Sequence, residues 1–170
     1  MNRYILYNKP KKIDLTNIPV HLAKAFSKFF KGLPYSTLSL DTNYSGLVLF
    51  YQDETFDIEK RSKQIKVLLD IQLKNNLKND EIKKITEDIL SLDKNSNFAF
   101  KSTELGVETT LYFQNSITEI LKKIDLLNID RVLISNLDKF EIPRGNYRVL
   151  KDIEVFNFKS LSYSPNKTPL

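Results

Sequence analysis

The stretch Leu40–Phe50 reads LDTNYSGLVLF and joins a turn to the start of a strongly apolar run. Asp41 and Gly46 are typical turn residues, and the run LVLFY over Leu47–Tyr51 has the length and composition of a buried strand. Asp41 therefore stands at the end of one extended segment and directly ahead of another. An aspartate in such a place is either a turn residue or a functional group presented by a rigid scaffold.

The sequence before this stretch predicts two strands and a helix. Arg3–Tyr7 is apolar and aromatic and is stopped near Pro10, as expected of a strand. Apolar residues at helical spacing predict a helix over Pro19–Lys31, with Gly32 where a C-terminal glycine belongs. A second strand is predicted over Tyr35–Leu40, leading directly to Asp41.

The sequence after it predicts helices over Asp80–Leu92 and Ser116–Leu127. The second of these helices has a capping box, in which Ser116 is followed three residues later by Glu119. Strands in groups of two or three between helices, without strict alternation, favour an α+β fold with a mainly antiparallel sheet. Further strands are predicted over Ile65–Leu73, Phe98–Lys101, Val107–Phe113, Arg131–Ile134, Tyr147–Leu150 and Glu154–Phe158.

Length and composition predict one domain over residues 1–158 and a disordered tail over 159–170. The 170 residues, 41% of them hydrophobic, suffice for a single core. The absence of cysteine and the single histidine exclude disulfides and the usual zinc sites. The sequence has no run of roughly 18 apolar residues and no secretory signal after Met1, so we expect a cytoplasmic protein without a membrane partner.

The positive charge is concentrated near the N-terminus. The net charge is +5, and the first 50 residues carry seven lysines and arginines against only Asp14 and Asp41. Such a basic segment favours binding to a polyanion such as RNA, because neutralised phosphates release counterions. Lys9, Lys11 and Lys12 are the candidates, although a solvated turn or a composition bias would give the same pattern.

Two motifs resemble a known family. YILYNKPK, over Tyr4–Lys11, is similar to the opening of RsuA-type pseudouridine synthases, in which an apolar strand leads into a near-constant N-K-P-K. LDTNYSGLVLF is similar to the catalytic motif of that family, roughly R-L-D-x-x-x-x-G-L-x-L-L. The resemblance places Asp41 at the position of the nucleophile and Gly46 five residues later.

Looser similarities continue along the chain, to about residue 158. The resemblance implies a single α+β pseudouridine-synthase-like domain with a bent, mainly antiparallel sheet flanked by helices, and without the S4 domain that many members have. It implies no metal and no organic cofactor. The partner it implies is structured RNA, with ribosomal RNA expected. The looser matches are Glu59–Val67, Tyr112–Leu127 and EIPRGNYRVL over Glu141–Leu150.

The chain departs from the family pattern at three places. The arginine two positions before the aspartate is Ser39 here, and the catalytic tyrosine is replaced by Ser62 or Ile65, depending on the alignment. The arginine-rich start of the last long helix is replaced by Ser116–Leu121. These changes remove the expected cationic partner of the nucleophile and the expected platform for a uracil base.

The reaction that the resemblance implies needs an ionised Asp41 in a partly dry pocket that a flipped nucleotide can enter. Burial raises the pKa of a carboxyl group, and a guanidinium partner lowers it. Arg61, Arg131 and Arg144 are candidates to replace the missing arginine. Lys9, Lys11 and Lys12 are candidate RNA contacts, together with Arg144 and Arg148.

Three functions stay open at this point. The first is a working RNA pseudouridine synthase, and the second is an RNA-binding module that has kept the fold but lost turnover. The third is a protein-interaction domain recruited from the same fold. An arginine within ion-pair reach of Asp41 and an aromatic ring beside it would favour the enzyme, whereas the fold alone does not distinguish the three.

Overall fold

A nine-stranded mixed sheet forms the body of the protein. The computed structural model of the chain describes residues 3–32 and 34–163. None of the helices in these ranges is long and apolar enough to cross a membrane. The elements are β1 (Arg3–Lys9), α1 (Val20–Phe29), β2 (Ser36–Leu38), β3 (Ser45–Gln52), α2 (Ile58–Arg61), β4 (Lys66–Leu73), α3 (Asn79–Leu92), β5 (Asn97–Lys101), β6 (Glu104–Thr110), α4 (Leu111–Leu121), β7 (Leu126–Ile134), β8 (Leu137–Asp138), β9 (Tyr147–Val149) and α5 (Asp152–Tyr163).

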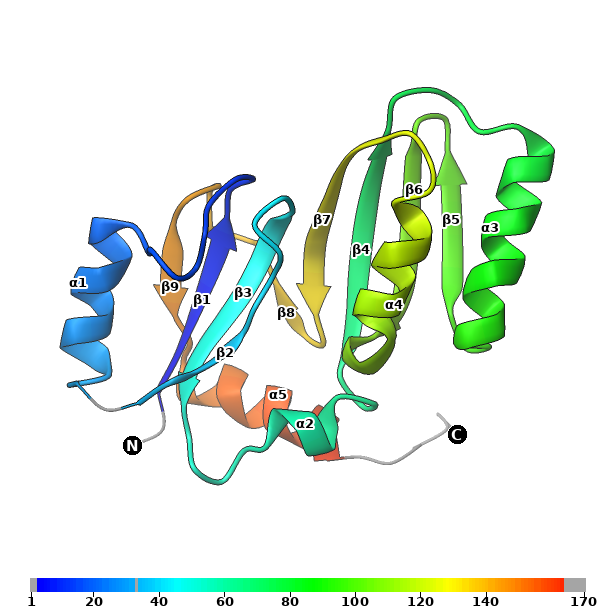
Figure 1. The fold of residues 1–170 in the computed structure, drawn as a ribbon. Helices are drawn as coiled ribbons and strands as arrows, with labels where there is room; N and C mark the ends of the chain where they lie inside the picture. The colour runs from blue at the N-terminus through cyan, green and yellow to red at the C-terminus, as the bar shows by residue number, and fades with distance from the viewer. Residues whose placement is uncertain (1–2, 33, 164–170) are drawn as a thin grey trace.

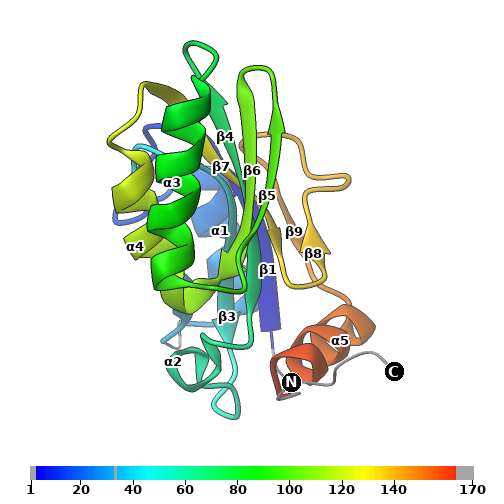
Figure 2. The same cartoon turned by 90° about the vertical axis from the view of Figure 1, so that its right-hand side faces the viewer.

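The strand order is β5-β6-β4-β7-β3-β1-β9, with β2 added to β3 and β8 added to β7. The pairing of β3 with β7 is parallel and the other pairings are antiparallel. The strands on the two sides of the β3–β7 junction run at an angle to one another (Figure 1). Helices α1, α3 and α4 lie on one side of the sheet and α5 on the other (Figure 2). The expected α+β fold with a mainly antiparallel sheet is confirmed.

Strands β1 and β3 are buried on both faces. Their alternate residues contribute to two apolar clusters, one packed with α1, α3 and α4 and the other with α5. This double burial explains why both strands are apolar throughout instead of alternating between apolar and polar residues. The first cluster includes Ile5, Tyr7, Val48 and Phe50, and the second includes Tyr4, Leu6, Leu47, Leu49 and Phe158.

Helix α5 is fastened to the sheet by a buried carboxylate just after β3. Asp53 Oδ2 accepts hydrogen bonds from Lys159 Nζ at 2.7 Å and from the Tyr4 hydroxyl at 2.6 Å. Burial alone would raise the pKa of Asp53, but these bonds and those from Thr55 lower it to about 2. The ionised carboxylate therefore links α5 to both β1 and β3.

The helix expected over Ser116–Leu127 is wrong at both ends, because α4 begins at Leu111 and ends at Leu121. Its buried face starts with Gln114, so the helical pattern begins one turn earlier than expected. Ser116 lies inside the helix and does not cap it. No glycine or proline separates β6 from α4, so the sequence contains no residue that marks the boundary between the strand and the helix.

The segment expected as a strand over Glu154–Phe158 is part of helix α5. Val155 and Phe158, three residues apart, are buried, whereas Phe156 is exposed, as on an amphipathic helix. Short apolar runs of this kind fit a strand and a helix equally well. Residues 159–163, expected in the disordered tail, also belong to α5, and residues 164–170 lie outside the described part of the chain.

The junction between β3 and β7 consists of two residue pairs, Ser45 with Asp130 and Gly46 with Arg131. Gly46 has a φ of +120°, and a Cβ atom on it would lie 2.4 Å from the backbone N and O of Arg131. Only glycine allows the two strands to approach this closely. Gly46, the glycine of the motif LDTNYSGLVLF, therefore lies where the two halves of the sheet meet, β5-β6-β4-β7 on one side and β3-β1-β9 on the other.

We predict that Gly46→Ala lowers the free energy of unfolding by about 3 kcal/mol or more, because the added methyl group must push β7 away from β3. The matched control is Gly106→Ala in β6, where the new Cβ would meet its nearest neighbour at 3.7 Å. This control is expected to change stability by less than about 1 kcal/mol. Chemical denaturation measures both values, and equal effects would contradict the role of Gly46.

Candidate active site

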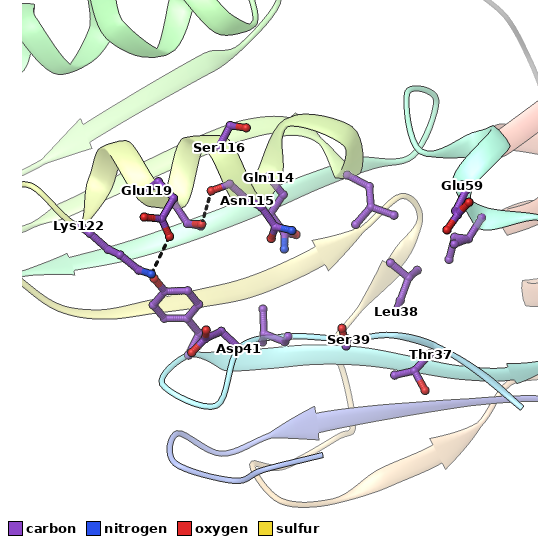
Figure 3. A pocket seen from close by; sticks show the side chains of 15 residues that line it. Thr37, Leu38, Ser39, Asp41, Glu59, Gln114, Asn115, Ser116, Glu119 and Lys122 are labelled. Carbon is purple, nitrogen blue, oxygen red and sulfur yellow. Dashed lines mark hydrogen bonds and ion pairs between the residues drawn. The ribbon is translucent and has the colours of Figure 1, made fainter. Parts of the chain in front are cut away.

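A cavity of about 830 Å³ lies between α4 and the chain segment that precedes β3 (Figure 3). This volume is in the range of small-molecule sites. Its floor and walls come from parts of the chain that are far apart in sequence. The lining residues are Thr37, Leu38, Ser39, Leu40, Asp41 and Tyr44 before β3, Ile58 and Glu59 of α2, and Leu111, Gln114, Asn115, Ser116, Thr118, Glu119 and Lys122 on or next to α4.

Asp41 lies in a tight turn at the edge of this cavity. Its Oδ1 accepts a hydrogen bond from the backbone N–H of Asn43 at 2.8 Å, and its carbonyl oxygen accepts one from Tyr44 at 3.0 Å. This is the turn geometry that the sequence offered as the alternative to a nucleophile. Within residues 3–32 and 34–163, however, no hydrogen bond reaches Oδ2. Asp41 is thus both a turn residue and a carboxylate presented to the cavity.

Lys9 is fully buried beneath this turn. Its ammonium group donates to the carbonyl oxygens of Thr42 and Tyr44, and also to two carbonyls of its own loop, those of Pro10 and Ile13. Burial lowers the pKa of Lys9 to about 8, although the negative charge of Asp41 opposes the shift. With its donors used internally, Lys9 is not placed to contact an RNA phosphate, which corrects the expectation from sequence.

Lys11 and Lys12 are exposed beside the same turn. Lys12 has a φ of +67° and donates its backbone N–H to the carbonyl of Thr42 at 2.8 Å. The ammonium group of Lys11 donates to the carbonyl of Leu127, the second residue of β7. Both side chains therefore stand at the rim of the region that contains Asp41.

Arg131 and Arg144, two of the three arginines expected to replace the missing partner of Asp41, bond to other groups. Arg144 makes two hydrogen bonds of 3.0 Å to Asp130. Arg148, expected as an RNA contact, pairs with Glu154 at 2.6 Å. Burial would raise the pKa of Asp130, but Arg144 and Ser45 lower it. Arg61 ends helix α2, whose first two residues line the cavity.

Arg131 is fully buried behind the cavity and holds its walls together. Its Nε donates to the carbonyl of Leu47 at 2.8 Å, its Nη2 to the carbonyl of Leu38 at 2.8 Å, and its Nη1 to Oε1 of Gln114 at 3.0 Å. Burial lowers its pKa to about 9. One guanidinium therefore connects β2, β3 and α4, and its bonds go to these acceptors and not to Asp41.

Tyr44 is an aromatic residue of the cavity that sequence reasoning did not single out. It is 7% exposed, and its hydroxyl lies beside the Lys122 ammonium. Burial raises the pKa of Tyr44, an effect that the charge of Lys122 and a side-chain hydrogen bond with it oppose. The Lys122 ammonium lies 5.8 Å from the ring centroid and pairs with Glu119 at 2.8 Å. The position of Tyr44 inside the motif, between Asp41 and Gly46, was the available signal.

Metal ligands do not gather at this site. In the ranges 3–32 and 34–163, no group of three or more histidine, cysteine, aspartate or glutamate residues could hold a metal ion. The lining groups suit a polar organic ligand, because carboxylates, amides, hydroxyls and one aromatic ring surround the cavity.

No protein-family model matches this sequence, and no curated protein matches it either. Among solved structures, the chain is similar to one described as the crystal structure of a pseudouridylate synthase, at 16% identity over 93% of this chain and 74% of that chain, with a TM-score of 0.63. Two weaker likenesses, each at 12% identity over 82% of this chain, are an archaeal box H/ACA sRNP Nop10–Cbf5 complex (50% of that chain, TM-score 0.46) and an H/ACA RNP bound to a substrate RNA containing 2′-deoxyuridine (49%, TM-score 0.45).

The likeness defines an architectural class. The domain is an α+β fold with a mixed sheet, and more particularly it has the fold of a pseudouridine synthase. A structural similarity at 16% sequence identity shows a shared fold and does not by itself show a shared activity.

We predict that Lys9→Met destabilises the protein by about 3 kcal/mol, because four carbonyl oxygens, among them that of the buried Tyr44, lose their shared donor. Lys11→Met, at an exposed position, is expected to leave the melting temperature unchanged. Thermal unfolding of both variants checks this difference. An unchanged melting temperature for Lys9→Met would show that its ammonium group is dispensable in the interior.

Proposed function

We propose that this chain is an RNA pseudouridine synthase of the RsuA type in which Asp41 is the nucleophile. The observation that carries the proposal is the place of Asp41. The aspartate of the matching motif stands on a rigid turn at the mouth of a cavity, in a domain with the fold of a pseudouridine synthase. A nucleophile must be held in position with one face open to the substrate, and this turn meets both conditions.

The proposed reaction isomerises uridine within RNA. The bond between ribose and N1 of uracil breaks, the base turns, and a new bond forms between the ribose and carbon 5. Carbon 5 loses a proton and N1 gains one, so no oxidant, reductant or cofactor is consumed. The carboxylate of Asp41 acts as a covalent nucleophile in this scheme, and the cavity retains the detached base.

A buried lysine lies near Asp41, where the family has an arginine. The ammonium group of Lys9 lies beneath the turn and interacts electrostatically with Asp41. Lys122 lines the same cavity but is paired with Glu119. Lys9 is therefore proposed to take over part of the electrostatic role that the family gives to arginine.

Structured RNA, with ribosomal RNA as the first candidate, is the proposed partner. Lys11 and Lys12 are the proposed phosphate contacts, because both are exposed beside the turn of Asp41. Arg144 and Arg148 are weaker candidates, since their guanidinium groups are already paired with Asp130 and Glu154. A cytoplasmic location would suit such a substrate.

A binding module without turnover is the second candidate function. The observation that favours it is that Arg131 and Arg144 bond to other groups, and that no arginine pairs with Asp41 in the part of the chain that the structure describes, residues 3–32 and 34–163. Such a module would bind RNA through the same basic rim and would form no pseudouridine.

We predict that Asp41→Asn abolishes pseudouridine formation while the melting temperature and RNA affinity change little. Asparagine keeps the turn hydrogen bond but lacks the anionic nucleophile. The matched control is Asp14→Asn, because Asp14 also accepts a backbone hydrogen bond two residues ahead, at 2.9 Å from Thr16, but does not line the cavity. Pseudouridine is mapped in cellular RNA from strains that carry the wild type, either variant or no protein.

The mapping separates the two candidate functions. A site that is modified with the wild type and with Asp14→Asn, but not with Asp41→Asn, supports the synthase. Modification that survives in Asp41→Asn would exclude Asp41 as the nucleophile. A wild type that binds RNA and modifies no uridine would support the binding module.

We predict that the double variant Lys11→Ala/Lys12→Ala weakens RNA binding at all sequences and lowers the slope of log affinity against log salt by about 2. The control is Lys83→Ala/Lys84→Ala, which removes the same charge from the exposed surface of α3. Binding to a transcribed ribosomal RNA fragment is titrated at several salt concentrations. Equal losses in the two double variants would indicate a diffuse charge effect without a defined contact at Lys11 and Lys12.

A further inference from the structure

The side chain of Gln114 has a fixed orientation between Arg131 and the cavity. It is 5% exposed, it lines the cavity, and its Oε1 accepts a hydrogen bond from Nη1 of Arg131. A guanidinium has only N–H donors. The oxygen of the Gln114 amide must therefore face Arg131, and its Nε2 group must face the other way.

The Nε2 group of Gln114 is a donor without a partner. Within residues 3–32 and 34–163, no acceptor is hydrogen-bonded to it. Figure 3 shows Gln114 extending from α4 toward the segment that contains Ser39 and Asp41. This nitrogen is open to the cavity and not sealed in the interior, so water or a ligand in the cavity can accept its hydrogen bond.

The ligand that fits this donor presents a carbonyl oxygen. Uracil has such an acceptor at carbon 4, whereas cytosine has an amino group there, which is itself a donor. Two donors cannot form a hydrogen bond, so a fixed N–H group that faces the carbon-4 edge of the base accepts uracil and rejects cytosine, although both bases have a carbonyl oxygen at carbon 2. The buried position of Arg131 keeps the amide from rotating by half a turn and presenting its oxygen instead.

We propose that Gln114 is the residue that selects uracil, donating its Nε2 hydrogen bond to the base oxygen at carbon 4, and that Arg131 is the positioning residue that sets its polarity. This inference rests on the proposed function, because it takes the base of the substrate to enter the cavity beside Asp41. It adds a specificity determinant to α4, a helix on which the expected basic residues are missing.

The test is Gln114→Glu, which keeps the size of the side chain and gives Arg131 an acceptor of opposite charge. One carboxylate oxygen can face the guanidinium while the other presents an acceptor to the cavity in place of the N–H donor. We expect the variant to fold with an unchanged or higher melting temperature. The matched control is Asn115→Asp, which introduces the same charge at the neighbouring lining residue.

Uridine 5′-monophosphate and cytidine 5′-monophosphate serve as probes, titrated against ¹⁵N-labelled protein. In the wild type, we expect the uridine nucleotide to bind more tightly and to shift the side-chain amide signal of Gln114. In Gln114→Glu, the ratio of the two affinities should fall roughly tenfold or more. Asn115→Asp should weaken both nucleotides together, because both carry the same phosphate, and leave the ratio unchanged.

Two results would overturn this inference. They are a wild type that does not prefer the uridine nucleotide, and a Gln114→Glu variant that keeps the wild-type ratio. Both results come from nucleotide binding and not from turnover, so they leave the test of Asp41 as the nucleophile unaffected. A wild type that selects the uridine nucleotide through Gln114 but forms no pseudouridine in RNA would refute the enzyme and support the selecting role of Gln114.

Discussion

The buried guanidinium of Arg131 is the interaction on which the rest of the structure depends. The two halves of the sheet meet at β3 and β7 in only two residue pairs, and Arg131 belongs to one of them. Its hydrogen bonds reach Leu38, Leu47 and Gln114, which lie on three different elements. A buried charge is tolerated only when its donors are satisfied, so β2, β3 and α4 must keep the arrangement that also forms the cavity.

The same close contact between β3 and β7 explains why a glycine, Gly46, stands in the motif LDTNYSGLVLF. Gly46 lies directly against the backbone of Arg131, and any side chain there would separate β3 from β7. Moving β3 would also move the carbonyl of Leu47 away from the guanidinium, and the turn that holds Asp41 precedes the same strand. The spacing between Asp41 and Gly46 therefore connects a fold requirement with the position of the carboxylate.

The sequence was sufficient for the fold class, for β1 and β3, and for the position of Asp41, because each of these is encoded in a short continuous stretch. It was insufficient where partners are distant in the chain. Lys9 is buried by carbonyls about 35 residues away, and the bonds of Arg131 span 17 to 93 residues. From the sequence alone, Lys9 and Arg131 are charged residues, and charged residues are expected at the protein surface. Helices α4 and α5 were misjudged for another reason, since LYF and EVFNF also satisfy the pattern of a strand.

Charge is distributed around the cavity in a way that suits a base more than a phosphate. Three carboxylates line it, those of Asp41, Glu59 and Glu119, and Glu119 already neutralises Lys122. A phosphate in that space would be repelled, whereas uracil is neutral and offers carbonyl oxygens to which the Gln114 amide can donate. The exposed cations Lys11 and Lys12 stand outside. Under the proposed function, an RNA strand whose backbone contacts Lys11 and Lys12 would direct a flipped base into the cavity, whose lining residues include no arginine.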